Sequence, residues 1–551
     1  MGSPDKAPGK PSAPLHEGRR ERVRADTFKE RGFRSMAVKV LFLIIFFAVM
    51  ILIGVMTRRK ARSVDGFVLG GRTAGPWLTA FGYGTSYFSA VVFVGYAGQF
   101  GYKYGVSATW AGIGNAVLGS LLAWIVLGRR TRVMTKHLNS RTMPDFFGKR
   151  FDSDSLKVAA ALISFVFLIP YTSSVYNGLS RLFRMAFDIP YTVCVIVMAA
   201  LTCVYVLLGG YMATVVNDFV QGIIMLFGIT AVILAVLKSN GGFLQALTTL
   251  SQYESDLPVT TGMKGAFTSF FGPDPMNLLG VVVLTSLGTW GLPQMVGKFY
   301  AIKDERSIKA GTVISTFFAI VVAGGCYFLG GFARLYSENP TITNPDGTIA
   351  YDAIIPAMLA GLPDILIGIV VVLVLSASMS TLSSLVLTSS SSVTLDLIAH
   401  FKKDMEEDRK LLIMRVLLVI FIIVSVVLAL NPPTFIAQLM GYSWGALAGS
   451  FLAPFLYGLY WKKTTKLSVW ASFIAGVGIT LSNMFLHYIK SPINAGALTM
   501  LAGLVIVPVV SLVTPKLQQS KIDDIFSGYE ETVTIQKRYS LKEEDDEASE
   551  N

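Results

Sequence analysis

Residues 367–395 read IGIVVVLVLSASMSTLSSLVLTSSSSVTL, an apolar segment that is long enough to cross a bilayer and is rich in hydroxyl groups. At 100° per residue, Ser383 lies at about −60°, Ser384 at about +40° and Thr381 at about +100° from Ser380. One sector of the predicted helix therefore carries four side-chain oxygens. Two interpretations stay open: a face that binds a polar partner, or hydroxyls that bond back to their own helix or serve as small contact residues.

The composition is that of a membrane protein. The 551 residues are 53% hydrophobic and only 15% charged, with a mean hydropathy of +0.58, whereas soluble chains carry about 25% charged residues. The net charge of +12 sits mostly in short loops beside apolar spans, so we interpret it as a topology signal and predict no nucleic-acid partner. No Walker loop, dinucleotide fingerprint or catalytic triad is found, which argues against an ATP-driven pump and against an enzyme.

Hydropathy predicts about thirteen membrane spans, and thus an all-α polytopic protein in a lipid bilayer. Residues 1–35 precede them as a disordered basic extension, and residues 515–551 follow as a tail too short for a catalytic domain. The predicted spans cover approximately residues 36–56, 75–99, 107–128, 156–183, 190–209, 211–237, 276–299, 307–333, 364–396, 411–430, 434–460, 467–488 and 493–514.

Loop cations set the predicted orientation. Lysine and arginine are concentrated in the loops at 58–62, 129–150, 303–309, 402–410 and 462–466, which we expect to face the cytoplasm of a plasma (inner) membrane. The tail is then cytoplasmic and the amino terminus lies outside. The basic extension should resist that placement, so either the natural chain begins at or near Met36 or the extension is atypical.

Two predicted spans are interrupted in mid-membrane. Residues 75–98 contain GYGTS at 82–86, and residues 279–299 contain Gly288, Gly291 and Pro293. Backbone groups freed at that depth must line a cavity or bind something, because lipid cannot satisfy them. These spans open two successive groups of five, at 75–237 and 276–460, which is the pattern of an inverted-repeat transporter. The alternative, that glycine and proline are simply common in membrane helices, stays open for each break.

Four strings resemble the sodium/solute symporter family, which includes the bacterial proline, pantothenate, sialic acid and sodium/glucose symporters. They are FVLGGRTAGPWLTAFGYGTSYFSA (67–90), GGYMATVVNDFVQ (209–221), GLPQMVGKFYAIK (291–303) and SASMSTLSS (376–384). The resemblance runs from about residue 38 to residue 514. It implies a five-plus-five inverted repeat of the LeuT type, with one accessory helix before it (36–57) and two helices after it (467–514). It also implies symport of a small organic solute, with Na+ as the coupling ion, by alternating access.

The same resemblance implies a principal sodium site built from neutral oxygens. An alkali cation prefers several such ligands, and an unwound helix supplies carbonyls already freed. The implied ligands are the carbonyls of Thr85, Phe88 and Ala377 and the hydroxyls of Ser380 and Thr381.

Asp218 is an ionisable residue inside a predicted span, and such residues mark functional sites. A structural polar cluster with Asn217 and Gln221 is the alternative. Some members of the family have a second sodium site at this aspartate, and the matching residues here are Asp218, Ser380, Ser383 and Ser384. We therefore predict two sodium ions per cycle. Coupling to one sodium ion, with Asp218 relaying it, or coupling to H+ is the alternative.

The solute is not determined by the sequence. The candidate lining residues beside the two breaks are Tyr87, Ser89, Phe93, Trp290 and Gln294, and simple helix packing is an equal alternative for each. Tyr87 replaces the acidic residue of the proline symporters, and neither the arginine of the sialic acid symporters nor the polar pair of the sugar symporters is present. An amino acid, vitamin, monocarboxylate or sugar stays open.

Two rival functions and the oligomeric state also stay open. A membrane sensor that keeps the symporter fold would need a signalling domain, which the tail after Thr514 does not contain. A passive channel would need weak successive sites rather than a well-coordinated one. A monomer is sufficient for symport.

Overall fold

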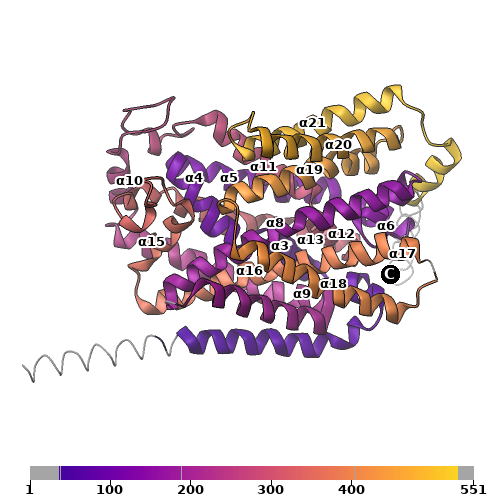
Figure 1. Cartoon of the computed structure of the whole chain (residues 1–551), viewed down its shortest axis with the longest axis horizontal. Helices are drawn as coiled ribbons and strands as arrows, with labels where there is room; N and C mark the ends of the chain where they lie inside the picture. The colour runs from indigo at the N-terminus through magenta and orange to yellow at the C-terminus, as the bar shows by residue number, and fades with distance from the viewer. Residues whose placement is uncertain (1–35, 37–38, 188, 403, 531–551) are drawn as a thin grey trace, which may run out of the picture.

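The computed structural model describes residues 36, 39–187, 189–402 and 404–530. The predicted extension at 1–35 and the end of the tail lie outside the described residues. Within the described chain, nine helices are long and apolar enough to cross a membrane, or ten if the bent pair α11 and α12 is one span. The architecture is all-α, and its helices run roughly side by side along the long axis of the molecule (Figure 1). The predicted number of thirteen spans and the inverted repeat stay predictions.

The helices have the following bounds. The long ones are Lys39–Ala61, α8 (Asp154–Phe187), α9 (Tyr191–Ser239), α11 (Pro275–Gly291), α13 (Glu305–Ala319), α16 (Asp364–Ser392), α18 (Glu407–Leu430), α19 (Ile436–Tyr460), α20 (Lys466–Leu486) and α21 (Pro492–Val513). The shorter ones are α2 (Val64–Leu69), α3 (Pro76–Tyr87), α4 (Ala97–Tyr104), α5 (Thr109–Gly114), α6 (Arg129–His137), α7 (Met143–Arg150), α10 (Phe243–Ser251), α12 (Pro293–Ala301), α14 (Gly325–Gly330), α15 (Ile354–Ala360) and α17 (Ala399–Phe401).

Helix α16, which contains the hydroxyl-rich segment, lies at the centre of the bundle. It packs against α3, α8, α9 and α18, and its side chains are buried almost continuously from Leu373 to Ser392. Helix Lys39–Ala61 lies along one edge of the bundle, and α20 and α21 lie along the opposite edge (Figure 1). The hydroxyls of α16 therefore face other helices and not lipid.

Both spans are interrupted, but the first break lies beyond the predicted GYGTS at 82–86, which is part of helix α3. Helix α3 ends at Tyr87, Phe88 is extended (φ −86°, ψ 105°), and a helical segment resumes at Val91. Helix α11 ends at Gly291 and α12 begins at Pro293, with a bend of 45° between them. A proline suits the first turn of a helix, because its missing N–H would have no partner there.

The end of the bundle that carries α6 and α17 is the end expected to face the cytoplasm (Figure 1). A helix at 519–530 in the tail packs on it, where the Tyr529 hydroxyl donates to Leu459 O at 3.2 Å and Lys462 pairs with Asp523 at 3.3 Å. The side chains of Ile522, Ile525 and Phe526 are buried there. The first part of the tail is thus an ordered layer on this end of the bundle.

We expect Gly210→Ala to destabilise the fold. Gly210 interrupts α9 with φ 54° and ψ −146°, a conformation that costs a side-chain-bearing residue about 1–3 kcal/mol. A Cβ atom there would also lie 2.9 Å from Phe67 O and 2.8 Å from its ring. The melting temperature of the purified variant in detergent should fall clearly. Gly478→Ala on α20 is the control, since a Cβ there meets nothing within 4 Å. Equal melting temperatures for the two variants would contradict this account of Gly210.

Candidate functional site

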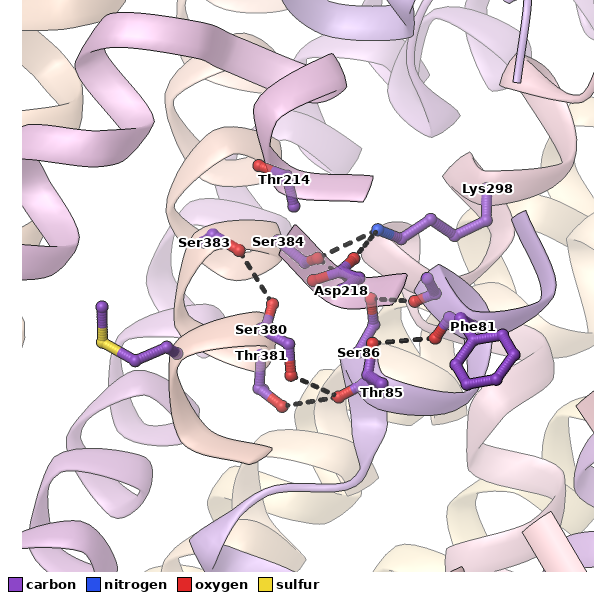
Figure 2. Close-up of polar contacts among 12 residues, drawn as sticks. Phe81, Thr85, Ser86, Thr214, Asp218, Lys298, Ser380, Thr381, Ser383 and Ser384 are labelled. Carbon is purple, nitrogen blue, oxygen red and sulfur yellow. Dashed lines mark hydrogen bonds and ion pairs between the residues drawn. The ribbon is translucent and has the colours of Figure 1, made fainter. Parts of the chain in front are cut away.

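Five oxygens from the α3 break and from α16 lie close together, and Figure 2 shows Thr85, Ser380 and Thr381 among the residues that carry them. The Ser380 hydroxyl donates to Thr85 O and to Ala377 O, both at 3.0 Å. The Thr381 hydroxyl lies 3.2 Å from Thr85 O, 3.1 Å from Ala377 O and 3.5 Å from Phe88 O. All five residues are at most 1% exposed. The structure therefore brings together every residue predicted for the principal sodium site.

The local structure explains this convergence. Because α3 stops at Tyr87, the carbonyls of its last turn lack helical donors and are free for other partners. The two hydroxyls also bond back to Ala377 one turn earlier, so both interpretations of the hydroxyl face hold at once. Oxygens that bind one hard cation at about 2.4 Å and at right angles lie about 3.4 Å apart. The observed separations of 3.0–3.5 Å are close to that value, so these neutral oxygens fit one alkali cation.

The residues predicted for a second sodium site have a different arrangement, because a lysine ammonium lies among them. Lys298 of α12 donates to Asp218 Oδ2 at 3.2 Å and to Ser384 Oγ at 3.1 Å (Figure 2). Ser383 instead donates to Ser380 O at 2.9 Å, and the Ser380 hydroxyl belongs to the first group of oxygens. Asp218 and Ser384 thus share a cation that the protein itself supplies.

The surroundings of this ion pair are closely packed. Lys298 is 2% exposed and Asp218 is fully buried, and the ammonium lies 5.4 Å from the centre of the Tyr211 ring, within the range of a cation–π contact. The Ser384 hydroxyl is also hydrogen-bonded to Ser86 at 2.9 Å, which connects the pair to α3. A Cβ atom at Gly82 would lie only 3.3 Å from Asp218 Oδ2, so a glycine leaves the room that this carboxylate needs.

A cavity of about 50 Å³ adjoins Lys298 and Ser384. It extends to Arg141 and Thr142, near the end of the bundle expected to be cytoplasmic. The cavity is also lined by Thr214, Gln294, Gly297, Leu387, Thr388, Ser391 and Ser392. Polar groups therefore connect the ion pair with one side of the protein.

A second polar network lies beyond this cavity. The Thr142 hydroxyl donates to Asp396 Oδ2 at 2.6 Å, and Lys157 pairs with Asp396 at 3.5 Å and with Asp145 at 2.9 Å. Burial works to raise the pKa of the Asp145 carboxyl, but the ammonium groups of Lys157 and Lys149 outweigh it and hold that pKa below its usual range. The network joins α7 and α8 to the helical segment Val393–Ile398 that follows α16.

The predicted substrate-lining residues are all buried beside the breaks. Some of their polar groups already have a hydrogen-bond partner, and others have none. The Trp290 indole donates to Leu118 O at 2.8 Å and is thereby occupied, and the Ser89 hydroxyl accepts from Val91 N at 3.1 Å. The Tyr87 hydroxyl and both polar atoms of Gln294 have no hydrogen-bond partner among the described residues. Phe93 is 1% exposed and can offer only apolar contact. Of the five, Tyr87 and Gln294 are thus the two whose side chains have polar atoms without a hydrogen-bond partner among the described residues.

Lys298 is absent from the residues predicted from the sequence. A lysine inside the apolar string 291–302 is itself a signal, because a membrane-embedded charge is expected to have a partner, and Asp218 is the other ionisable residue predicted at mid-membrane. Ser86, which contacts Ser384, is the other residue that was missed, and its neighbour Thr85 was predicted for its carbonyl alone.

Comparison with known proteins gives consistent matches. The model of the "Sodium:solute symporter family" matches residues 67–476. The osmoregulated proline transporter of Bacillus subtilis is 29% identical over 86% of this chain and 94% of its own length, and the sodium/proline symporter of Escherichia coli K12 is 29% identical over 80% and 86%.

Among solved structures, a Na+-coupled sialic acid symporter in a substrate-bound, outward-open state superposes with a TM-score of 0.69, at 14% identity over 88% of this chain and 99% of that one. The transporter MhsT in complex with L-phenylalanine gives a TM-score of 0.51, at 14% identity over 80% and 97%. Both likenesses concern the fold alone.

Proposed function

This chain belongs to the sodium:solute symporter family, and we propose that it is a sodium-coupled secondary active symporter that carries a small organic solute across the plasma membrane. Its relatives are transporters and not enzymes, and its apolar helices are those of a multi-pass membrane protein. The orientation of the termini stays a prediction from the loop charges.

The observation that carries this proposal is the convergence of five uncharged oxygens at the α3 break. They belong to Thr85, Phe88, Ala377, Ser380 and Thr381. Because the ligands are neutral, a bound sodium ion adds its full charge to the complex. Inward movement of that charge gains about 2.3 kcal/mol per 100 mV of membrane potential, which is the driving force that symport uses.

We propose a small zwitterionic amino acid as the solute, with L-proline as the first candidate. The names of the relatives support this class. The buried Tyr87 hydroxyl beside the break also supports it, because it has no hydrogen-bond partner among the described residues and offers a neutral donor and acceptor. Since Tyr87 stands where the proline symporters are expected to have an acidic residue, a monocarboxylate is the competing class.

The number of sodium ions is a separate question. The sequence predicts two, with Asp218, Ser380, Ser383 and Ser384 around the second. The ammonium of Lys298 favours the alternative of one ion, because it already contacts Asp218 and Ser384. We therefore propose one sodium ion per cycle.

Purified protein in proteoliposomes should accumulate labelled L-proline when an inward sodium gradient is imposed. A membrane potential that is negative inside should raise the limiting accumulation by up to about 50-fold per 100 mV if one net charge moves with the solute. Protein-free liposomes and an equal gradient of K+ are the controls. Uptake that is equally fast in K+ would contradict sodium coupling. Sodium-dependent uptake of lactate without uptake of proline would instead favour the monocarboxylate class.

A further inference from the structure

We propose that Lys298 is a tethered cation that occupies the second cation position of this transporter and thereby excludes a second sodium ion. The inference rests on the proposed function, because it concerns the ion count of the same transport cycle. Its basis is the ammonium of Lys298, which lies 3.2 Å from Asp218 Oδ2 and 3.1 Å from Ser384 Oγ at the residues predicted for that ion (Figure 2).

The position is one for a cation. Asp218 supplies a negative charge, Ser384 supplies a hydroxyl oxygen, and the face of the Tyr211 ring is 5.4 Å away. Both charged side chains are almost completely buried. A buried carboxylate needs a counter-charge, and Lys298 provides it from the same molecule.

One carboxylate neutralises one cation. If a sodium ion entered beside the Lys298 ammonium, Asp218 would face two positive charges in a buried place, which is unfavourable. Lys298 and a second sodium ion are therefore alternatives at Asp218. The lysine is covalently attached, so it does not dissociate with the solute and adds no ion to the transport stoichiometry.

The two cation positions are also adjacent. Ser384 lies one helical turn beyond Ser380 on α16, and Ser86 follows Thr85 on α3 and is hydrogen-bonded to Ser384 at 2.9 Å. The ion pair thus holds α3, α9, α12 and α16 together beside the principal site. It does so without a net charge that would repel the transported sodium ion.

Removal of the ammonium should open the position to sodium. In Lys298→Met, the carboxyl group of Asp218 and the hydroxyls of Ser384 and Ser86 remain, and the cavity of about 50 Å³ that reaches Arg141 adjoins the vacated volume. That cavity can hold water and gives an ion a route of entry.

The test measures equilibrium binding of ²²Na+ to the purified full-length protein, so it does not require the solute. We expect about one saturable sodium ion per wild-type chain and about two per Lys298→Met chain. Lys298→Arg is the matched control, since it keeps a cation and should stay at about one. The double variant Lys298→Met/Asp218→Asn lacks both charges and should also stay at about one.

Thermal unfolding gives a second readout that does not depend on counting ions. Lys298→Met should melt at a lower temperature than the wild type in choline, and should regain stability when sodium replaces choline, more strongly than the wild type does. Lys298→Arg should respond to sodium as the wild type does.

The outcomes are distinguishable. Two saturable ions per wild-type chain would overturn the inference and leave sodium symport intact. A Lys298→Met protein that binds one ion, and whose melting temperature rises in sodium by no more than that of the wild type, would also overturn it. No saturable sodium binding by the wild type would contradict the proposed function itself, and this inference with it.

Discussion

Asp218→Asn is expected to lower the free energy of unfolding by about 3–5 kcal/mol, because it leaves the Lys298 ammonium buried without a counter-charge. In the wild-type pair the ammonium contacts Asp218 Oδ2 and Ser384 Oγ, whereas Asp218 Oδ1 has no hydrogen-bond partner among the described residues. Loss of the carboxylate removes the attraction but not the cost of burying the lysine. The melting temperature in detergent should fall by several degrees or more, and sodium should not restore it.

The double variant Lys298→Met/Asp218→Asn should recover most of that loss, since neither buried charge then remains. The coupling energy from the two single variants and the double variant isolates the pair. Glu254→Gln is a control at an ion pair in which both side chains are about 60% exposed, and it should cost less than about 1 kcal/mol. If Asp218→Asn were as stable as Glu254→Gln, the ion pair would not be formed in the protein.

The interruption between Gly291 and Pro293 could be predicted from the sequence, because glycine and proline in the middle of an apolar run weaken a membrane helix. The glycines at 82 and 84 did not locate the first break, because they lie inside helix α3. The structure has these breaks at Phe88 and Leu292. The long helix α9 differs from the sequence prediction, which divides it into two spans. The predicted division between residues 209 and 211 falls at a kink at Gly210 inside α9, which extends from Tyr191 to Ser239.

The residues of the predicted principal sodium site follow from the family resemblance and not from the spacing of residues along the chain. Ser380 and Thr85 are 295 positions apart, and no periodicity in a single sequence indicates that an unwound turn of α3 meets one face of α16. The sequence does predict the contribution of α16 itself, because helical periodicity places the hydroxyls of Ser380 and Thr381 in one sector of the helix. Helical periodicity does not predict the partner of that sector, which is the Thr85 carbonyl at the α3 break.

The Lys298–Asp218 pair could not be predicted from resemblance, because the motif that identifies the second ion site consists of the aspartate and the serines alone. All of those residues are present here, and the prediction of two ions followed from them. Lys298 of α12, 80 positions away from Asp218, is the residue that favours one sodium ion over two. A lone charge in an apolar segment needs a partner, and on that ground the sequence alone indicates Lys298 and Asp218 as a candidate pair.

Ser380→Ala and Thr381→Ala are each expected to raise the sodium concentration for half-maximal uptake by about 10- to 100-fold. Each substitution removes one of the five oxygens proposed to hold the ion, and a hydrogen-bonding group that meets a charge is worth about 1.5–3 kcal/mol. The maximal rate at saturating sodium should change less, because in the proposed site these side chains contact the ion and not the solute. The measurement is a sodium titration of uptake in proteoliposomes, with ²²Na+ binding as a solute-independent check.

Two controls separate ion binding from packing. Thr381→Ser keeps the hydroxyl and should stay within a few-fold of the wild type, although it loses a methyl group. Ser390→Ala removes another buried hydroxyl of α16, whose hydrogen bond goes to Leu387 O of the same helix, about 15 Å along the helix axis from Ser380. Its sodium dependence should match that of the wild type. Unchanged sodium dependence in both Ser380→Ala and Thr381→Ala would mean that these hydroxyls only bond back to Ala377, and the coupling ion would then have to bind elsewhere.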